Sequence, residues 1–285
     1  MLDVEFDVSY RSWVCSEYNG TKLKKNSITN CLTVDVEDYF QVSAFADRVS
    51  RKDWDKYECR VEANTDRLLA IFYEAEVLGT FFVLGWVAER YPGLVRRIAA
   101  AGHEIASHGY WHQLVYDLSP EEFDQDIRDS KDAIHNACGI EVAAYRAPSF
   151  SIVPRSRWAL GVLAKNGFTV DSSIFPIAGH DRYGDPDAPK AIHTIETDYG
   201  PIIEFPPTAG RINLGIKRFP LPIGGGYFRL FPLRLTQFAI NQVNMGMLCF
   251  TRILGNSIPI NLALLECHEK ADSGTTLDFL TLRTD

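Results

Sequence analysis

The sequence predicts an α/β fold built on a parallel sheet or barrel. Short apolar runs bounded by glycine or acidic residues alternate with longer segments of helical periodicity. The longer segments carry helix start and stop signals, whereas the apolar runs are too short for buried helices. Strands that alternate with helices pair in parallel, because each helix returns the chain to the start of the next strand.

The first half of the domain is expected to contain three strands and two helices. "CLTVDV" is strand-like and stops at acidic residues, and "GTFFVLG" is a buried run between glycines. Tyr91-Pro92 begins a helix that ends at Gly102, a residue type common just after a helix. The expected strands are 31–36, 79–85 and 103–107, and the expected helices are 60–76 and 91–101.

The second half begins with a capping box, Ser119-Pro120-Glu121-Glu122, which predicts a helix to about Cys138 that stops at Gly139. "VAAYRAP" and "FTVDSS" are short strands separated by a helix, and "AIHTIETDYGPIIEFPP" is predicted as an antiparallel hairpin that decorates the sheet. The corresponding ranges are 142–148, 155–166, 168–173 and 191–207. We expect one domain over 29–245, preceded by a poorly ordered extension over 1–28.

Composition excludes several classes of function. The chain has 285 residues, 46% of them hydrophobic, and a net charge of −8, which disfavours nucleic acid or an anionic membrane as a partner. No apolar run reaches the roughly 20 residues of a membrane-spanning helix. The six cysteines form no CxxC motif, and the first residues do not resemble a secretory signal, so a cytoplasmic location is expected.

Chemically active side chains fall repeatedly at the carboxyl ends of the predicted strands. In parallel α/β folds, ligands bind beyond these ends. Four separate strand ends with such residues are hard to explain as surface decoration. The residues are Asp35, Glu37 and Asp38, then His108 and His112, then Arg146, then Asp171.

Two histidines four residues apart, His108 and His112, share one face of a helical turn, so both rings can reach one ion. Two histidines and a carboxylate with an open position form a hydrolytic zinc arrangement. The spacing alone is also compatible with two partly buried histidines bonded to backbone. Each other motif has a plain structural alternative too: an acidic loop, a surface arginine at Arg146, or a turn-capping aspartate at Asp171.

Together these motifs resemble the polysaccharide deacetylase family, the NodB homology domain of carbohydrate esterase family 4. The resemblance rests on "LTVDVEDYF", "SHGYWH", "RAPSF" and "DSSIFP" in order, and it covers about residues 30–245. "FPLPIGGGYFRLFP" adds a likeness to the branch associated with exopolysaccharide loci and exosortase (PEP-CTERM) systems. The resemblance implies a distorted (β/α)7 barrel, with the hairpin added, that removes N-acetyl groups from N-acetylhexosamine units.

The resemblance also implies roles for individual residues. Asp35 would be the base, Arg146 would tether it, and Asp171 would belong to the catalytic set. The ligands of a divalent metal, expected to be zinc, would be His108, His112 and Glu37, with Asp38 as the competitor of Glu37. The residues expected to contact an N-acetylated glycan are Tyr110, Trp111, Pro148 and Phe150.

The carboxyl-terminal part departs from the family pattern, which usually ends with a histidine motif that helps protonate the departing amine. After Asn244 the only histidine is His268. Codons for a family-like His-Pro-Trp-Glu-Phe-Asp-Pro-Asn-Gln-Pro-Arg, read one base later, give "ILGNSIPINLA", which is residues 253–263. We therefore predict that a frameshift replaced the native end over 246–285, leaving the barrel incomplete and its activity weak; the alternative is a divergent tail.

Two other functions compete with deacetylation of a polysaccharide or its precursor. One is metal-dependent hydrolysis of a small amide, as in the allantoinase-like relatives of the family. The other is an inactive carbohydrate-binding or scaffold protein. Aromatic residues along an open groove would favour a sugar, a closed pocket would favour a small amide, and bound metal without acetate release would favour the inactive protein. The sequence does not define an oligomeric state.

Overall fold

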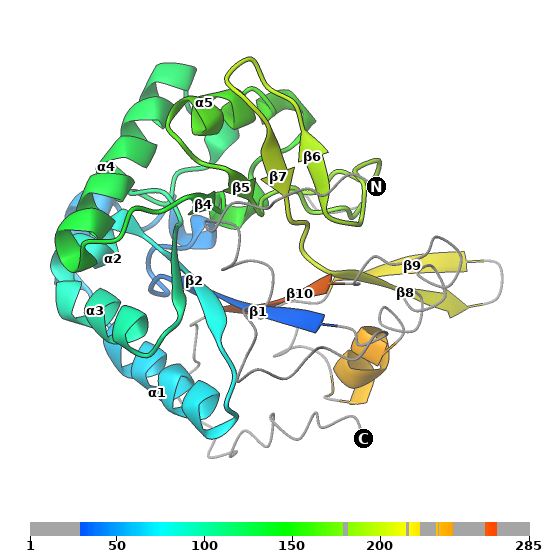
Figure 1. Ribbon diagram of the computed structural model, residues 1–285, viewed down its shortest axis with the longest axis horizontal. Coiled ribbons are helices and arrows are strands. Elements are labelled where there is room, and N and C mark those ends of the chain that lie inside the picture. Colours follow the sequence, from blue (N-terminus) through cyan, green and yellow to red (C-terminus); the bar gives the residue numbers. More distant parts are fainter. Residues whose placement is uncertain are drawn as a thin grey trace, which may run out of the picture.

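The central element is an eight-stranded sheet that is almost entirely parallel (Figure 1). The computed structural model describes residues 29–178, 182–214, 217–222, 232, 234–241 and 260–266. The strand order is β10-β1-β2-β3-β4-β5-β7-β6, and only β6 and β7 pair antiparallel. The predicted α/β class is therefore confirmed, and the described strands form an open, barrel-like sheet.

The predicted strands are present, although those near the candidate site are short. Because their pairings are parallel, the carboxyl ends of β1 to β5 and of β7 lie along one edge of the sheet. The strands are β1 (Thr29–Val36), β2 (Gly79–Val83), β3 (Glu104–Ser107), β4 (Ala144–Tyr145), β5 (Val170–Asp171), β6 (His193–Ile195), β7 (Ile202–Glu204), β8 (Ala209–Leu214), β9 (Lys217–Pro222) and β10 (Ile260–Glu266).

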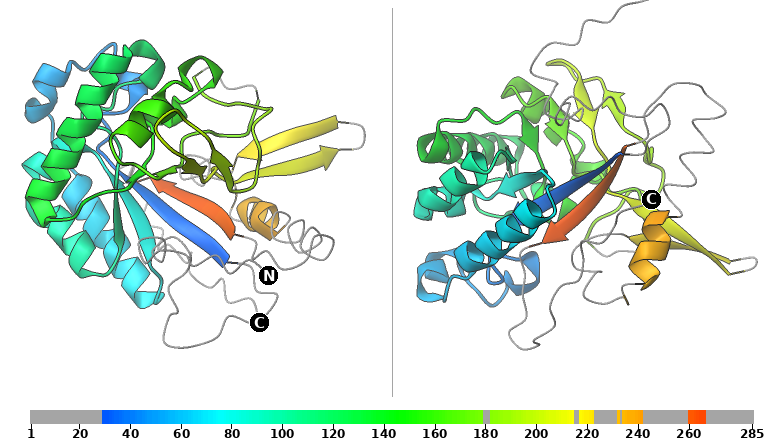
Figure 2. Two further views of the ribbon diagram at one scale, coloured as in Figure 1. Left: turned by 45° about the horizontal axis from the view of Figure 1, so that its top comes forward. Right: turned by 60° about the horizontal axis from the view of Figure 1, so that its bottom comes forward.

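Helices lie along the outer side of the curved sheet (Figures 1 and 2). They are α1 (Val61–Glu74), α2 (Gly85–Arg90), α3 (Pro92–Ala100), α4 (Pro120–Cys138) and α5 (Ala159–Lys165), and residues 234–241 are also helical. Short 3-10 turns occur at Ser43–Phe45, Arg51–Lys56, Val115–Asp117, Pro148–Phe150 and Pro154–Ser156. No helix in the described ranges is both long and apolar enough to cross a bilayer.

The sheet is buried on both faces, as expected for parallel strands. One face packs against the helices through the main apolar core, which includes Val34, Phe81 and Val83. The other face carries a smaller cluster around Phe82 and Ala106. The side chains alternate because successive residues of a strand point to opposite faces. This second, inner face is the one on which the arginine of the candidate site lies.

The capping signals predicted for the longest helix, α4, are confirmed. Ser119 Oγ accepts a hydrogen bond from Glu122 N at 3.2 Å, and Glu122 Oε2 accepts one from Ser119 N at 2.8 Å. Gly139 ends the helix with φ 75°, a left-handed conformation that glycine adopts at little cost. The sequence therefore fixes α4 through local interactions at both ends.

Two features at the edges of the sheet differ from the sequence-based expectation. The hairpin predicted as a decoration is part of the main sheet, because β7 pairs in parallel with β5. At the other edge, residues 260–266 of the atypical tail pair with β1 as strand β10 (Figure 2), so this edge of β1 is covered although an incomplete barrel is predicted. The extension over 1–28 and the rest of the tail, 246–259 and 267–285, lie outside the described residues, as do 242–245 at the end of the predicted domain.

Candidate metal centre

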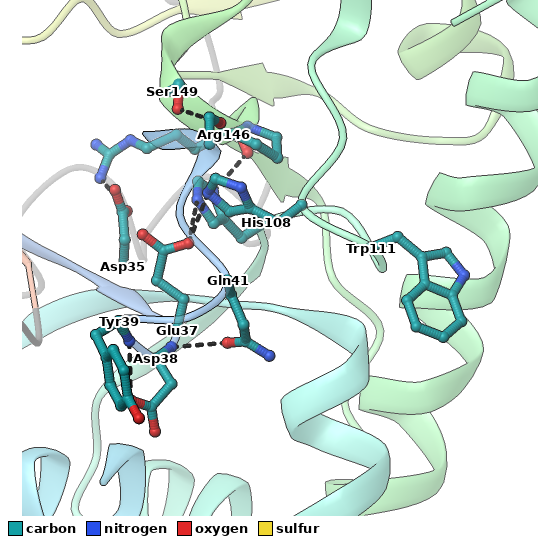
Figure 3. Close-up of polar contacts among 12 residues, drawn as sticks. Asp35, Glu37, Asp38, Tyr39, Gln41, His108, Trp111, Arg146 and Ser149 are labelled. Carbon is teal, nitrogen blue, oxygen red and sulfur yellow. Dashed lines mark hydrogen bonds and ion pairs between the residues drawn. The ribbon is translucent and has the colours of Figure 1, made fainter. Parts of the chain in front are cut away.

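Three potential metal ligands converge at the carboxyl edge of the sheet. Glu37 follows β1, and both histidines follow β3. Glu37 Oε2 lies 2.6 Å from His112 Nε2 and 3.9 Å from His108 Nε2 (Figure 3). One ligand atom from each of the three side chains lies within 4.8 Å of the others, and all three residues are buried. Two imidazole nitrogens and one carboxylate oxygen at this spacing fit a single divalent ion.

The backbone sets which nitrogen of His108 faces the centre. Its Nδ1 lies 2.8 Å from the carbonyl oxygen of Arg146. Because a carbonyl oxygen can only accept a hydrogen bond, Nδ1 carries the proton and Nε2 keeps its lone pair. Burial lowers the pKa of His108, against the opposing effects of Asp35 and Glu37, so the ring is held in its neutral, ligating form.

The turn that carries the two histidines is not helical, so the helical spacing assumed for the pair is wrong. Residues 108–114 form an irregular loop after β3. Gly109 has φ 74° and His112 has φ 51°. The reversal of the chain at these left-handed positions brings both imidazoles to one point. A non-glycine residue such as His112 adopts this conformation at an energetic cost, and such residues concentrate at functional sites.

Asp126 of α4 holds this turn from behind, a role that the sequence did not indicate. Its Oδ2 accepts a hydrogen bond from Tyr110 N at 2.9 Å, and its Oδ1 accepts one from Trp111 N at 3.1 Å. Burial raises the pKa of the Asp126 carboxyl, against the effect of the two backbone donors. A Cβ on Gly109 would lie 2.8 Å from Asp126 Oδ2, so glycine is required for this close approach.

Asp38 points away from the histidines (Figure 3). Its Oδ2 accepts hydrogen bonds from Arg60 N at 2.5 Å and Val61 N at 2.9 Å, and its Oδ1 accepts one from Tyr39 N at 2.8 Å. Two of these donors lie at the amino-terminal end of α1, where unpaired N–H groups and the helix dipole favour a carboxylate. The geometry therefore favours Glu37 over Asp38 as the metal ligand.

Asp35 and Arg146 form a buried ion pair next to the triad (Figure 3). Arg146 Nη1 donates to Asp35 Oδ1 at 2.8 Å. The Arg146 residue has 0% exposure, so the alternative of a surface arginine is wrong. Asp35 and Glu37 are two residues apart and project to the same side, as the alternation along a strand requires. One strand end thus supplies both a candidate base and a candidate ligand.

Further contacts compensate the burial of the Arg146 guanidinium. Its Nη1 also donates to Thr33 Oγ1 at 3.0 Å, its Nη2 to Ser172 Oγ at 2.9 Å, and its Nε to the carbonyl oxygen of Ser172 at 3.2 Å. The guanidinium carbon lies 4.0 Å from the ring centroid of Phe82. A charged group taken out of water is tolerated only when its donors are paired in this way. The sequence motif "DSSIFP" contained Ser172, but nothing in it indicated this contact.

Asp171, the fourth predicted strand-end residue, does not join the triad. It is fully buried at the end of β5, where its Oδ1 accepts a hydrogen bond from Ser173 Oγ at 2.5 Å. In the parallel register its neighbour on β7 is Glu204, a fully buried carboxyl that the sequence did not identify. Only the pairing of β5 with β7 brings these two residues together.

The residues predicted to contact substrate have packing roles in the structure. Trp111 is half-buried, lies away from the triad in Figure 3, and packs against Trp54 with ring centroids 5.8 Å apart. Tyr110 donates a hydrogen bond to Glu89 through its hydroxyl. Pro148 and Phe150 are buried, and a contact of any of the four with a glycan stays a prediction.

The fold and the site together define a class: an α/β protein with a candidate divalent-metal site beside a buried aspartate–arginine pair. Comparison with known families then shows which family parts of the chain resemble. The family described as "Polysaccharide deacetylase" matches residues 53–170, and a "Domain of unknown function (DUF3473)" matches residues 172–250. These matches and the relatives below show that this part of the chain is similar to the polysaccharide deacetylase family, of the NodB or carbohydrate esterase 4 type.

Curated relatives match parts of the chain. A chitooligosaccharide deacetylase of Rhizobium leguminosarum bv. trifolii is 38% identical over 74 residues, which is 26% of this chain and 34% of the relative. A peptidoglycan-N-acetylglucosamine deacetylase of Bacillus cereus is 30% identical over 96 residues, which is 33% of this chain and 35% of the relative. The chain thus spans about a third of the length of these relatives.

A solved structure supports the fold over most of the chain. A candidate polysaccharide deacetylase from Mycobacterium smegmatis superposes with a TM-score of 0.55 at 22% identity, covering 87% of this chain and 79% of that chain. At this level of identity the likeness shows the fold alone.

Proposed function

We propose that this protein is a metal-dependent deacetylase that hydrolyses N-acetyl groups on an N-acetylhexosamine-containing glycan or its precursor. The observation that carries the proposal is the placement of the Glu37–His108–His112 triad beside the Asp35–Arg146 pair at one sheet edge. The named activities of the curated relatives, deacetylation of chitooligosaccharides and of peptidoglycan, support the same reaction for this chain.

The donor set fits a divalent ion, and we propose zinc because it favours two imidazoles and one carboxylate with a position left open. Glu37, His108 and His112 would hold the ion. When bound, it supplies Lewis-acid activation of the acetamide carbonyl and of the attacking water. The buried location strengthens this electrostatic effect, because little water screens it.

The side chains of this chain supply proton transfer and orientation. Asp35 accepts the proton of the attacking water as general base, and Arg146 holds the carboxylate in place through the 2.8 Å contact. The water oxygen adds to the acetamide carbon and the carbon–nitrogen bond breaks, which releases acetate and a free amine. The amine needs one proton, and Asp35 carries one after the attack.

Acetate release from N-acetylglucosamine oligomers tests the proposal. Wild-type protein supplied with zinc is expected to release acetate, and Asp35→Asn is expected to lose on the order of 10²–10⁴-fold in kcat while retaining its metal. Parallel assays with a small cyclic amide address the allantoinase-like alternative. Protein that binds one metal ion per chain but hydrolyses neither the oligomers nor the cyclic amide would contradict the proposal. That result would favour an inactive binding protein.

We further propose that the glycan belongs to an exopolysaccharide pathway and that the protein acts in the cytoplasm. The "FPLPIGGGYFRLFP" segment, residues 219–232, supports the first part, although most of it lies outside the described residues. Cys59 and Cys138 are free thiols, which is compatible with a reducing compartment. Fractionation of cells that express the tagged protein tests its location.

A further inference from the structure

Two buried carboxyl groups face each other on neighbouring strands outside the triad. Asp171 ends β5 and Glu204 ends β7, and the two are register partners. Both residues have 0% exposure. One oxygen of each has a donor: Ser173 Oγ for Asp171 Oδ1 at 2.5 Å and Ile174 N for Glu204 Oε1 at 3.1 Å. In the described part of the chain, no group other than the partner carboxyl reaches the remaining oxygens, Asp171 Oδ2 and Glu204 Oε2.

Two carboxylates enclosed in this way cannot both be ionised, because their charges repel and both groups are fully buried. A single proton between the two unpaired oxygens removes the repulsion and gives both oxygens a hydrogen-bond partner. Burial and then the charge of Asp171 raise the pKa of Glu204 well above its usual range. Burial also raises the pKa of Asp171, but hydrogen bonds from Glu204 and Ser173 and the charge of Arg146 oppose the shift. The proton therefore belongs on Glu204.

Other charged and titratable groups around the pair are few. The charge of Arg146 favours ionised Asp171, and that of Arg157 favours ionised Glu204, although Arg157 is also paired with Asp185 at 2.5 Å. The phenol of Tyr145 is fully buried, and burial raises its pKa, so it is neutral. His193 is the register partner of Glu204 on β6, with its Nδ1 3.0 Å from the carbonyl oxygen of Ala191.

The pair connects directly to the residues that hold the candidate base. Ser173 Oγ, which donates to Asp171, accepts a hydrogen bond from Ala147 N at 2.8 Å. The adjacent Ser172 accepts from Arg146 through both its hydroxyl and its carbonyl oxygen. Arg146 in turn donates to Asp35. A shift of the segment after β5 would therefore displace the Arg146 guanidinium from Asp35.

We propose that Glu204 is a positioning residue: it shares one proton with Asp171, and this carboxyl pair fixes the segment after β5 that holds Arg146 against Asp35. The kinetic consequence rests on the proposed function, because it treats Asp35 as the base. The existence of the shared proton does not rest on the proposed function. An experiment can therefore reject the shared proton and the deacetylase function separately.

Infrared spectroscopy tests the pair independently of activity. Wild-type protein at neutral pH is expected to show the carbonyl stretch of a protonated carboxylic acid, and Glu204→Gln is expected to lose it. Glu196→Gln, an exposed glutamate of the same hairpin, is the matched control and should keep the band. A wild-type spectrum without the band, or a band unchanged in Glu204→Gln, would overturn the proposal.

Stability as a function of pH provides a second readout. A folded-state pKa that is raised gives a stabilisation that is full below the usual pKa of glutamate, about 4.3, and is lost as the pH rises through the folded value. The unfolding free energy of wild type, relative to Glu204→Gln, should therefore fall as the pH rises above about 4.3. A difference that is flat or rises with pH contradicts a proton on Glu204.

Kinetics test the positioning role. Glu204→Gln keeps a donor toward Asp171 and should retain kcat close to wild type. Glu204→Ala removes the donor and should lower kcat on the order of 10- to 100-fold with little change in KM, as expected for a displaced catalytic group. Equal losses in both variants, or no loss in Glu204→Ala, would count against positioning. If Glu204→Ala does not fold, the infrared band of wild type and its loss in Glu204→Gln still test the shared proton.

A bound cation is the alternative to the shared proton. Uptake of a second metal ion by wild type, abolished in Glu204→Gln, would overturn the proposal.

Discussion

At the scale of single residues, two adjacent carboxylates have different surroundings: one lies beside the histidines, and the other accepts hydrogen bonds at the start of a helix. Glu37 and Asp38 are neighbours in "DVED", and nothing local separates a ligand from a structural carboxylate. The distinction depends on the amino-terminal end of α1, which begins more than twenty residues later and presents its N–H groups to Asp38. Only the folded chain contains that information.

Substitution of the two neighbours should therefore have opposite effects. Glu37→Gln is expected to lose bound metal with little change in stability, because a neutral amide is a weak ligand. Asp38→Ala should keep one metal ion per chain and lose about 1–2 kcal/mol of unfolding free energy, the cost typical of a lost helix cap. Elemental analysis and chemical denaturation measure the two effects. Retention of metal by Glu37→Gln and its loss from Asp38→Ala would reverse the assignment.

At the scale of elements, most strands and helices follow from periodicity and capping, whereas α2, β10 and the histidine loop do not. The His108–His112 spacing predicts a helical turn, but the loop brings the two rings together through residues in the left-handed conformation. The histidine loop is supported by Asp126, which lies on α4 and accepts hydrogen bonds from backbone N–H groups. Because every residue type except proline carries this N–H group, the contact leaves no pattern in the sequence. The hairpin was recognised, but its pairing with β5 is a long-range contact, so Glu204 was missed.

The loop gives a prediction about metal affinity. Asp126→Asn exchanges one carboxylate oxygen for an amide N–H group, which cannot accept from the Tyr110 or Trp111 N–H. The loop should loosen, and the affinity for zinc should fall on the order of 10- to 100-fold, as is typical when support behind metal ligands is lost. Asp132→Asn, an exposed aspartate on the same helix, is the control. Equal zinc affinities by competition titration in Asp126→Asn and wild type would contradict a supporting role.

At the scale of the whole molecule, the tail is the feature that the sequence and the fold explain least. The match to the second family ends at residue 250, and of the residues beyond it the structure describes only 260–266, as β10. A strand beside β1 is what a parallel sheet requires, and the apolar run "INLALLE" meets that requirement whether the tail is divergent or frameshifted. The frameshift stays a prediction.

The nucleotide sequence of the gene tests the frameshift. The alternative frame is expected to encode His-Pro-Trp-Glu after residue 244, and a chain with that frame restored should deacetylate faster, on the order of 10²–10⁴-fold for a regained acid–base group. Absence of that motif from the alternative frame, or equal rates for the two chains, would show that the tail is native and divergent.

The central claim is that one divalent ion held by Glu37, His108 and His112 enables deacetylation. The most direct measurement is a titration of metal-free protein with zinc, followed by acetate release from N-acetylglucosamine oligomers. The account predicts that the rate rises from background and saturates at one ion per chain, and that His108→Ala stays at background throughout. Acetate release by metal-free protein, or an equal response of His108→Ala to zinc, would contradict it.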